Sequence, residues 1–377
     1  MYKICYVVTI SGSIRAFFVP QLQYLAKNGL DVTVICAPDN ALQQLLGNDI
    51  RYIPVDIPRG VSLKGSFFAI RELARIFKKE KFDLIQYSTP NAAFYASLSA
   101  KKAGCKLRNY HMMGIRYLGA SGNGRMVLKW LEKVTCKNST HIECVSKSNR
   151  DLGIKEGLFP SDKVTVVWNG STGGVDLERF NYSRREEWRK EVREELGYNE
   201  NEFVYGFVGR ITRDKGINEL IESFSLLNND TKLFIIGPQD EMGTLNQELL
   251  EQARKNKNIL FHDGVYDIER YYAAIDALIL PSYREGFGNV IIEAGAVGTP
   301  AIVSNIPGPI DTISSDTAIT VPVKDVEGLK VAMLRMREAD YKEIGRKAAQ
   351  FARDNFDSNE LNKKILERKL KLLKEAE

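Results

Sequence analysis

The chain has 377 residues, of which 44% are hydrophobic and 27% charged, so it is long enough for about two domains with substantial cores. No apolar run approaches the roughly 20 residues that span a bilayer, and the first residues read as a strand rather than as a signal peptide. The five cysteines are scattered without metal-ligand spacing, which indicates reduced thiols in a cytosolic protein and no metal site.

Charge is unevenly divided along the chain. Residues 1–150 contain 22 Lys and Arg against 9 Asp and Glu, a net charge of +13, whereas the remainder has 31 against 39, a net charge of −8. This asymmetry favours an anionic partner for the first half, such as an anionic membrane surface or a lipid diphosphate. A solvated basic face is the alternative. No nucleic-acid-binding motif accompanies these charges, so nucleic acid is not an expected partner.

Strand and helix patterns alternate along the whole chain, which predicts an α/β fold with two doubly wound parallel sheets. The expected strands lie near residues 2–8, 31–36, 51–54, 83–87, 107–110, 140–145 and 163–167, and then near 203–209, 232–236, 258–262, 277–281, 300–303 and 318–321. Residues 169–180, NGSTGGVDLERF, interrupt the alternation with three glycines and predict a linker. The domains are therefore expected at residues 1–173 and 174–356, followed by an amphipathic helix over 359–375.

Residues 9–18, TISGSIRAFF, follow the first strand and predict a loop that contains Gly12 between two serines. This segment is not a G-x-G-x-x-G fingerprint, which disfavours a dehydrogenase. Arg15 has two interpretations here: it approaches the phosphate of an acceptor, or it is a surface cation.

Residues 67–82 predict an amphipathic helix. Its apolar face is formed by Phe67, Ile70, Leu73, Ala74 and Phe77. Its opposite side carries four cations, namely Arg71, Arg75, Lys78 and Lys79. One interpretation is a helix packed on its sheet, and the other is peripheral docking on an anionic membrane.

Residues 114–125 are rich in glycine and contain Arg116, Tyr117 and Arg125. We expect a mobile loop that binds an acceptor, because binding residues are common on loops held by a rigid scaffold. Directly before this segment, His111 follows an apolar strand. A neutral imidazole at a strand end can hydrogen-bond a sugar hydroxyl or a developing charge.

Residues 203–210, FVYGFVGR, form an apolar strand that ends in Gly-Arg, and a helix is expected to begin near Ile217. Ligands of open α/β sheets bind beyond the carboxyl ends of the strands, so Arg210 and Lys215 are predicted to lie at a binding cleft. Two fixed cations there would neutralise a diphosphate.

Residues 281–304, PSYREGFGNVIIEAGAVGTPAIVS, are the most informative segment of the chain. They put Glu285 in a Gly-rich turn and Glu293 inside an apolar helix, expected from about Gly288 to Val297. Gly286 and Gly288 would let backbone N–H groups at the helix start approach a ligand. A carboxylate in apolar surroundings is costly unless it is hydrogen-bonded, and the vicinal hydroxyls of a sugar offer paired donors.

Three motifs together resemble one known family. EGFGNVIIE matches an E-x7-E signature, GRITRDKG matches G-R-x4-K-G, and NGSTGGVDLERF is similar to N-G-V-D-x-x-x-F with extra residues inserted after Gly170. The chain thereby resembles the retaining glycosyltransferases of the GT-B fold, family 4. The resemblance implies two Rossmann-like domains that face each other across a cleft. Residues 1–173 would bind the acceptor, residues 174–356 would bind the nucleotide sugar, and a last helix, about 357–377, would cross back to the first domain.

The resemblance also implies roles for individual residues. Arg210 and Lys215 would act as electrophilic catalysts on the leaving diphosphate, since charge develops there in the transition state. Glu285 and His111 would contact the transferred sugar, and Glu293 would bind the nucleotide ribose.

The remaining donor-site residues follow from the same resemblance. The segment between the two glutamates would line the donor through Gly286, Phe287, Gly288, Asn289 and Val290. Ile268, in VYDIERY, would hold the nucleobase through its backbone. Gly12 stands alone where family members carry a glycine-rich loop. The acceptor residues would be Arg15, Arg116, Tyr117 and Arg125.

Residues 116–125, RYLGASGNGR, match the pattern R-Y-x-G-x-x-G-x-x-R. This pattern resembles that of a branch of the family that builds capsules and glycans on lipid-linked acceptors. This branch implies transfer of a hexose or N-acetylhexosamine from a UDP-sugar to a polyprenyl-diphosphate-linked glycan. The transfer would retain configuration and need neither a metal nor a further cofactor, and the enzyme would work in the cytoplasm or peripherally on the inner face of the plasma membrane. Two alternatives remain: a GT-B nucleotide-sugar epimerase, which the E-x7-E context disfavours, and a non-catalytic sugar-nucleotide-binding scaffold, which would not require all four charged residues.

Overall fold

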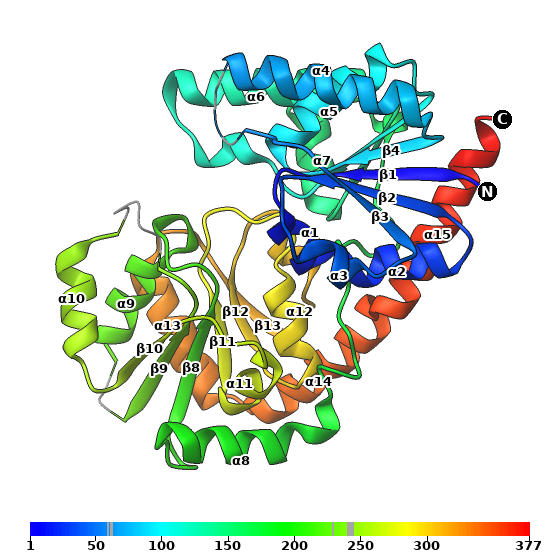
Figure 1. Ribbon diagram of the computed structural model, residues 1–377. Helices are drawn as coiled ribbons and strands as arrows, with labels where there is room; N and C mark the ends of the chain where they lie inside the picture. The colour runs from blue at the N-terminus through cyan, green and yellow to red at the C-terminus, as the bar shows by residue number, and fades with distance from the viewer. Residues whose placement is uncertain (59, 61–62, 228–229, 240–244) are drawn as a thin grey trace. The chain divides into compact units, whose positions relative to one another are not determined.

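The computed structural model describes residues 1–58, 60, 63–227, 230–239 and 245–377 (Figure 1). Within these residues the chain forms two compact units. Unit 1 consists of Met1–Gly173 together with Asn359–Glu377, and unit 2 consists of Gly174–Ser358. Both units alternate strands with helices, so the prediction of an α/β fold with two parallel sheets is confirmed.

Unit 1 is built on a seven-stranded sheet, counted over the described residues, in the order β3-β2-β1-β4-β5-β6-β7. All neighbouring strands are parallel. Their apolar runs are short and continuous, as expected for strands that are buried on both faces. The strands are β1 (Lys3–Val7), β2 (Asp31–Cys36), β3 (Ile50–Pro54), β4 (Leu84–Tyr87), β5 (Leu107–Met112), β6 (His141–Cys144) and β7 (Val164–Thr165).

Helices cover both faces of this sheet (Figure 1). Alternate residues of β1 enter different cores, because successive side chains of a strand point to opposite faces. Cys5 and Val7 pack in one core with α4 to α7, and Ile4 and Tyr6 pack in the other with α1 to α3 and α15. The helices are α1 (Ser11–Phe17), α2 (Val19–Lys27), α3 (Leu42–Leu46), α4 (Leu63–Glu80), α5 (Pro90–Lys102), α6 (Gly122–Asn138), α7 (Lys147–Lys155) and α15 (Ser358–Glu375).

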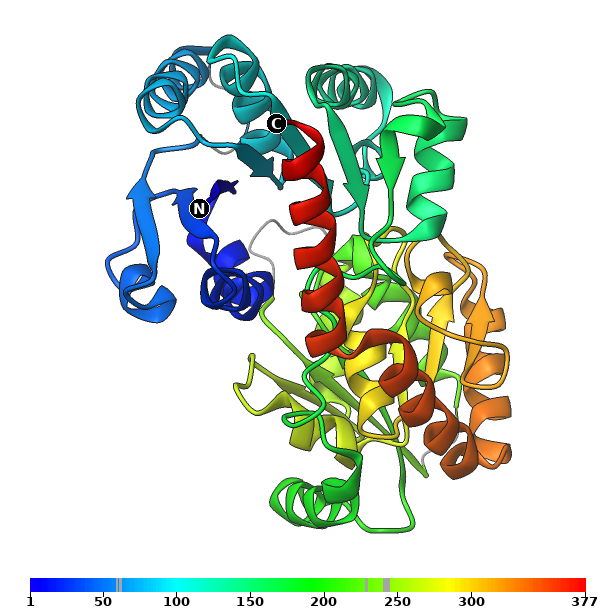
Figure 2. The same cartoon turned by 90° about the vertical axis from the view of Figure 1, so that its right-hand side faces the viewer.

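Helix α15 packs on the sheet of unit 1, although the whole of unit 2 precedes it in the sequence (Figure 2). Leu361, Ile365 and Leu372 follow a helical spacing and are all buried. The same face carries Lys369, which is 1% exposed. Its Nζ donates a hydrogen bond of 2.6 Å to Gln86 Oε1 and lies 3.9 Å from Glu143 Oε2. The helix is therefore fixed by both an apolar stripe and a buried charge.

Unit 2 is built on a six-stranded parallel sheet, again within the described residues, in the order β10-β9-β8-β11-β12-β13. In both units the order reverses beside the first strand, which creates a topological switch point between β1 and β4 and another between β8 and β11. Open α/β sheets bind ligands at such points, beyond the carboxyl ends of the strands. The strands are β8 (Phe203–Val208), β9 (Thr231–Ile236), β10 (Ile259–His262), β11 (Ala277–Leu280), β12 (Ala301–Ser304) and β13 (Ala318–Val321).

The helices of unit 2 form two groups, in which α9, α10 and α13 contact one another, as do α8, α11, α12 and α14. Helix α8 is anchored by Arg193, whose guanidinium lies 2.6 Å from the buried Asp276 carboxylate. The helices are α8 (Arg185–Leu196), α9 (Ile217–Ser225), α10 (Gln247–Lys255), α11 (Ile268–Ala274), α12 (Asn289–Ala296), α13 (Val326–Glu338) and α14 (Tyr341–Phe356).

Three local predictions were wrong. Residues 9–18 do not form a loop, because α1 begins at Ser11 and Gly12 lies in its first turn. The segment 114–125 contains a short 3-10 helix, Arg116–Gly119, and the start of α6. The interpretation of residues 67–82 as a helix packed on its sheet fails for Phe67, whose side chain is 62% exposed. In each case the residue pattern indicated polarity but not how neighbouring elements pack.

The two segments that connect the units run beside each other. Val175 forms an isolated parallel bridge with Asp357, with hydrogen bonds of 2.7 Å from Val175 N to Phe356 O and 2.9 Å from Ser358 N to Val175 O. Gly174 has a φ of +67°, and a Cβ there would lie 2.6 Å from Phe356 O. Glycine is therefore required at this crossing, where the two backbones approach closely.

Candidate active site

The switch point of unit 2 brings together two of the predicted residues. The segment after β8 leads through a short 3-10 helix, Arg213–Lys215, and the segment after β11 contains Glu285. Lys215 Nζ lies 2.5 Å from Glu285 Oε1, which also accepts a hydrogen bond of 2.9 Å from Ser282 Oγ. The ion pair is mostly buried, with side chains 19% and 13% exposed. A cation and a carboxylate are thus held in register at the sheet edge where ligands bind.

Glycine makes this approach possible. Gly216 has a φ of +73°, and a Cβ on it would lie 2.2 Å from Pro281 O, so no other residue fits between the two segments. A second ion pair, Arg284 to Asp214 at 2.9 Å, connects the same segments. Burial raises the pKa of Asp214, but a hydrogen bond from Thr212 and the nearby Arg284 outweigh it, so the pKa is lowered overall.

Arg210 differs from Lys215 in its surroundings. It follows β8 directly and is exposed, and within the described part of the chain it makes no hydrogen bond or ion pair. A guanidinium that holds no carboxylate can bind two oxygens of an incoming phosphate group. Among the described residues, the switch point therefore offers Arg210, which has no ion-pair partner, beside the paired cations Lys215 and Arg284.

The start of α12 lies next to Glu285. Gly288 is its N-cap, with a φ of +104°, and because glycine has no side chain it supplies no side-chain cap to the first turn at Asn289 and Val290. Gly308 packs against this turn, and a Cβ on it would lie 3.1 Å from the backbone of Glu285 and Gly286. A helix N-terminus with a tightly packed glycine turn suits a negatively charged ligand.

Phe287 is not available through its side chain. The ring is 5% exposed and packs edge-on against Phe356, with centroids 5.5 Å apart. Phe287 therefore anchors the turn in the core, and only its backbone could meet a donor.

Glu293 lies within α12 and is partly buried. Its Oε2 accepts a hydrogen bond of 3.0 Å from the hydroxyl of Tyr272 on α11. Burial raises the pKa of Glu293, and the hydrogen bond from Tyr272 and the charge of Arg179 oppose this rise. Ile268 is the first residue of the same helix α11. Helix α11 therefore carries both Ile268, the predicted nucleobase contact, and Tyr272, which hydrogen-bonds Glu293, the predicted ribose contact.

His111 lies in β5 of unit 1 and is 7% exposed. Its Nε2 lies 3.4 Å from Thr172 Oγ1, and its ring meets Phe18 edge-on at 5.7 Å. Burial is the main reason why the pKa of His111 is lowered to about 4. The charge of Lys369 also lowers this pKa, and the charge of Glu143 opposes the shift. The imidazole is therefore neutral at neutral pH, a state in which one ring nitrogen donates and the other accepts.

The switch point of unit 1 contains two threonines that the sequence did not single out. Thr89 follows β4 and has a φ of +64°, a region that β-branched residues rarely adopt. Its Oγ1 lies 2.8 Å from Thr9 Oγ1 and accepts a hydrogen bond of 3.0 Å from Thr9 N. Strain of this kind is often found at functional sites. The Thr-Pro dipeptide gave no signal, because a residue before proline normally favours extended backbone.

The four predicted acceptor residues lie in different surroundings. Arg15 makes a two-pronged ion pair with Asp39, at 2.9 Å. Tyr117 is 1% exposed, so its ring belongs to the core, and Arg125 lies over that ring at 5.8 Å. Arg116 is exposed and donates a hydrogen bond of 3.1 Å to Asn91 Oδ1. Arg116 thus differs from Arg15 in having a neutral hydrogen-bond partner instead of a carboxylate.

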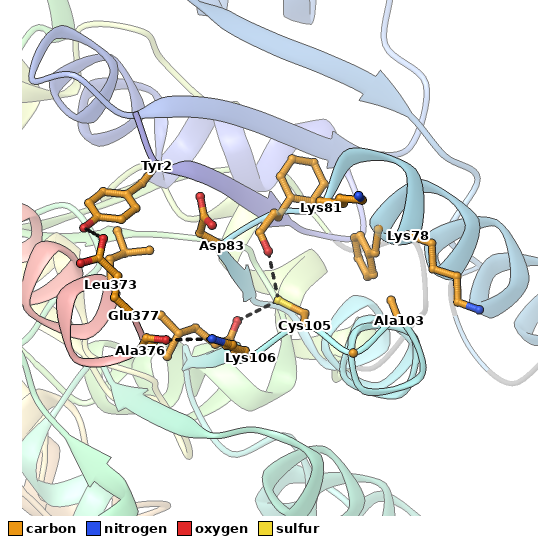
Figure 3. Close-up of a pocket in the computed structure, with 14 residues that line it drawn as sticks. Tyr2, Lys78, Lys81, Asp83, Ala103, Cys105, Lys106, Leu373, Ala376 and Glu377 are labelled. Atoms are coloured by element: carbon orange, nitrogen blue, oxygen red, sulfur yellow. Dashed lines mark hydrogen bonds between the residues drawn. The ribbon is translucent and has the colours of Figure 1, made fainter.

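A separate cavity of about 430 Å³ lies at the opposite, amino-terminal edge of the sheet of unit 1 (Figure 3). Tyr2, Asp83 and Leu107, at the beginnings of β1, β4 and β5, line it. Tyr2 donates a hydrogen bond of 2.5 Å to Glu377, and Lys106 donates one of 3.1 Å to Ala376 O. This edge lies away from the carboxyl ends of the strands, so the cavity does not belong to the candidate active site.

The described residues form neither a cluster of metal ligands nor a membrane-spanning helix. In the ranges that the structure describes, no group of three or more His, Cys, Asp and Glu side chains is arranged to hold a metal ion. Over the same residues, no helix has both the length and the apolar character needed to cross a membrane.

Comparisons with known proteins place the chain in a family. Residues 189–353 match the family described as Glycosyl transferases group 1, and residues 21–179 match Glycosyltransferase Family 4. The capsular polysaccharide biosynthesis glycosyltransferase CapM of Staphylococcus aureus is 29% identical over 100% of this chain and 98% of its own. The putative teichuronic acid biosynthesis glycosyltransferase TuaC of Bacillus subtilis is 30% identical over 85% of this chain and 84% of its own.

Two further similar proteins are described together with the molecules that they use or bind. An Escherichia coli UDP-Gal:alpha-D-GlcNAc-diphosphoundecaprenol alpha-1,3-galactosyltransferase is 26% identical over 84% of this chain and 83% of its own. The crystal structure of Anabaena HepE in complex with UDP and glucose superposes with a TM-score of 0.78 at 20% identity, covering 98% of this chain and 99% of that one. The family resemblance and the fold are therefore confirmed, and the chain belongs to the family 4 glycosyltransferases of the GT-B fold.

Proposed function

We propose that this glycosyltransferase moves a hexose or N-acetylhexosamine from a UDP-sugar to a polyprenyl-diphosphate-linked glycan, with retention of configuration. The observation that carries the proposal is the Lys215–Glu285 ion pair beside the exposed Arg210 at the switch point of unit 2. Lys215 and Arg210 would bind the diphosphate of the donor, and Glu285 would meet the sugar that the diphosphate carries. An ammonium has three N–H donors, so Lys215 can hold Glu285 and a phosphate oxygen together.

In this reaction the bond between the anomeric carbon and the diphosphate oxygen breaks, and its electron pair leaves with UDP. The hydroxyl oxygen of the acceptor forms the new bond on the same face of the sugar, and its proton passes to the departing diphosphate. The two cations stabilise the charge that develops on the leaving group, without a metal ion. His111, which burial keeps neutral, would hydrogen-bond the transferred sugar.

The donor and acceptor classes are supported by similar proteins. The E. coli relative is named for a UDP-galactose donor and a diphosphoundecaprenol acceptor, and HepE was crystallised with UDP and glucose. CapM and TuaC are named for capsular polysaccharide and teichuronic acid biosynthesis. We extend these classes to this chain, with Glu293 and the backbone of Ile268 as the nucleoside contacts, and with peripheral membrane association through unit 1.

A thermal-shift screen with UDP, GDP, ADP and CMP tests the donor part of the proposal. A ligand at 100 times its Kd adds about 2.7 kcal/mol of stability. We expect a shift by UDP that is lost in both Arg210→Ala and Glu293→Ala. A shift by another nucleotide alone would contradict the UDP donor, and no shift by any nucleotide would contradict the nucleotide site itself.

The transfer itself is tested by incubating the protein with UDP-sugars, with and without a polyprenyl-diphosphate-linked acceptor. We expect UDP release that depends on the acceptor, and a product with the anomeric configuration of the donor by NMR. Inverted product would contradict the retaining mechanism. Conversion of the donor into an epimer without acceptor would instead identify an epimerase.

A further inference from the structure

A second cavity in unit 1 lies away from the cations and glutamates described above. It has a volume of about 330 Å³ and is formed between facing sides of α5 and α6. Phe94 and Tyr95 of α5 face Leu128, Trp130 and Leu131 of α6 across it. The half-buried Phe94 ring contacts the exposed Trp130 ring, with centroids 6.4 Å apart. A cavity of this size with mostly apolar walls is typical of a site for a small ligand or a chain segment.

The cavity opens toward the carboxyl edge of the sheet. Pro90 and Asn91, which line it, begin α5 directly after the strained Thr89 at the switch point. Asn91 is held by hydrogen bonds of 2.8 Å to Pro58 O and 3.1 Å to Gly60 O. The mouth of the cavity is therefore built on rigid contacts and lies at the edge where a GT-B acceptor would be held.

One cation marks this mouth. Asn91 Oδ1 accepts a hydrogen bond of 3.1 Å from Arg116, which also lines the cavity. Arg116 is exposed and forms no ion pair with any described residue. Its side chain is positioned by a neutral amide, so its charge and its remaining N–H donors are available to an anion.

Apolar side chains are also exposed around the cavity. Trp130 and Val127 of its wall are 59% and 50% exposed, and Met126 beside them is 66% exposed. Phe67 and Phe68 of α4 are 62% and 56% exposed and lie next to Ser66, which lines the cavity. Large exposed apolar patches usually mark a binding surface. Polar residues also line the cavity, and two of them have protein partners: Glu132 accepts a hydrogen bond of 2.6 Å from Tyr110, and the Ser66 hydroxyl lies 2.8 Å from that of Tyr95.

We propose that this cavity binds the first isoprene units of the polyprenyl chain of the acceptor, while Arg116 binds the diphosphate to which the chain is attached. The inference rests on the proposed function and adds a subsite for the lipid. Two observations support it: the Arg116 guanidinium has no ion-pair partner among the described residues, and an apolar cavity opens beside it. A phosphate-binding site alone would explain only the first, and a hydrophobic surface patch alone would explain only the second. A polyprenyl diphosphate presents the same two chemistries in the same order.

The shape of the site favours a chain over a flat bilayer. A bilayer surface could meet Phe67, Phe68 and Met126, which protrude. It could not reach Tyr95, which is 4% exposed within the cavity wall. A single methyl-branched chain can enter the space between the helices and stack its planar double bonds on the aromatic rings.

Isothermal titration of the whole protein with farnesyl diphosphate, a short and soluble polyprenyl diphosphate, tests the inference. Inorganic diphosphate and farnesol serve as the separate halves of the probe. We expect farnesyl diphosphate to bind more tightly than either half. Trp130→Ala and Val127→Asp should each weaken its binding about tenfold or more, since each removes apolar contact area or puts a charge in the wall. Arg116→Ala should weaken farnesyl diphosphate but leave farnesol unchanged.

Two substitutions on α6 serve as matched controls, Met126→Gln for an exposed apolar residue that does not line the cavity and Lys137→Ala for an exposed cation at the far end of the helix. Both should bind farnesyl diphosphate within about twofold of the unchanged protein. A melting temperature for each variant shows that it is folded, so that lost binding can be assigned to the cavity.

Several results would overturn the inference. Inorganic diphosphate that binds as tightly as farnesyl diphosphate would show that the chain adds nothing. Binding that survives in Trp130→Ala and Val127→Asp would place the chain elsewhere. Binding only to vesicles that contain anionic lipid, lost in a Phe67→Ser/Phe68→Ser variant, would assign the patch to a bilayer. A UDP thermal shift on the same samples tests the donor site independently, so failure of the lipid subsite can be distinguished from failure of the proposed function.

Discussion

The two switch points share a topology but differ in chemistry. In unit 2 the segments after β8 and β11 carry charge, with Lys215 paired to Glu285 and Arg210 left free. In unit 1 the segments after β1 and β4 meet through the hydroxyls of Thr9 and Thr89, and the nearby cavity is apolar. The edge of unit 2 thus carries a buried ion pair, whereas the edge of unit 1 carries neutral hydroxyls beside a mostly apolar cavity that Arg116 also lines.

This difference shows that the fold fixes where ligands bind, while the segments after the strands decide which ligands they are. The four predictions below test the comparison, beginning with the largest expected effect.

Lys369→Ala should destabilise the protein by about 3–5 kcal/mol, because it removes the buried cation beside the Glu143 carboxylate and leaves only the more exposed Arg368, 3.9 Å away. Hydrogen exchange should show faster exchange in the strands of unit 1 and unchanged exchange in those of unit 2. The control is Lys371→Ala on the same helix, whose side chain is 66% exposed and should contribute less than about 0.5 kcal/mol. Equal loss of protection in both sheets would contradict the assignment of α15 to unit 1.

Arg210→Ala and Lys215→Ala should each lower the rate of sugar transfer about 100- to 1000-fold, the usual cost of losing a donor to a developing oxyanion. The folded state of Arg210→Ala should be as stable as the unchanged protein, since Arg210 has no ion pair to lose. Acceptor-dependent UDP release measures the rate. Arg213→Ala, on the same 3-10 helix, is the matched control. A comparable loss in that variant would mean that the turn, rather than the two cations, is needed.

Glu132 and His111 should oppose each other in the pH dependence of stability. Burial raises the pKa of Glu132 from 4.5 to about 7, so its contribution to stability falls as pH rises from 4.5 to 7. Burial lowers the pKa of His111 from 6.5 to about 4, so its contribution rises as pH rises from 4 to 6.5. Each shift corresponds to about 3 kcal/mol, and the two partly cancel between pH 4.5 and 6.5.

Single substitutions separate the two effects. Glu132→Gln should gain stability relative to the unchanged protein as pH rises, and His111→Gln should gain relative stability as pH falls. Denaturant unfolding at several pH values between 4 and 8 measures the difference. Parallel profiles for Glu132→Gln and the unchanged protein would mean that the pKa of Glu132 is the same in the folded and the unfolded protein.

Arg15→Ala should have the smallest effect of the four, a change in acceptor KM within about threefold, because Arg15 is already engaged by Asp39. The lowered pKa of Asp39, about 2, arises from hydrogen bonds by Ser11 and Arg15 and agrees with this engagement. Arg116→Ala should raise the same KM more strongly. The opposite order would move the acceptor phosphate from Arg116 to Arg15.

Much of the fold could be predicted because both sheets consist of short apolar strands separated by amphipathic helices. Each expected strand overlaps an observed one, for example residues 277–281 and Ala277–Leu280. The errors occurred where local polarity does not determine packing. Ser11 and Gly12 predict a loop, yet Ile14 and Phe18 behind them are fully buried and hold this segment as a helix.

The candidate site could be predicted only where spacing carried the information. The spacing within GRITRDKG and EGFGN singled out Lys215 and Glu285, which the structure brings together. The sequence did not predict that Tyr272 would hydrogen-bond Glu293, because the two residues belong to different helices. It also did not predict the contact between Thr9 and Thr89, which follow different strands. Such partners become visible only once the strand order is known.

The placement of α15 has a consequence for the order in which the protein is made. Unit 2 is continuous in sequence, so it can fold as soon as residue 358 has left the ribosome. Unit 1 cannot be completed then, because the helical face with Leu361, Ile365 and Leu372 still has to be synthesised. Until α15 has been synthesised, the sheet of unit 1 exposes the apolar side chains that α15 later covers. Glu143 also lacks Lys369 until then. Unit 1, whose synthesis starts first, is thereby the last to be completed.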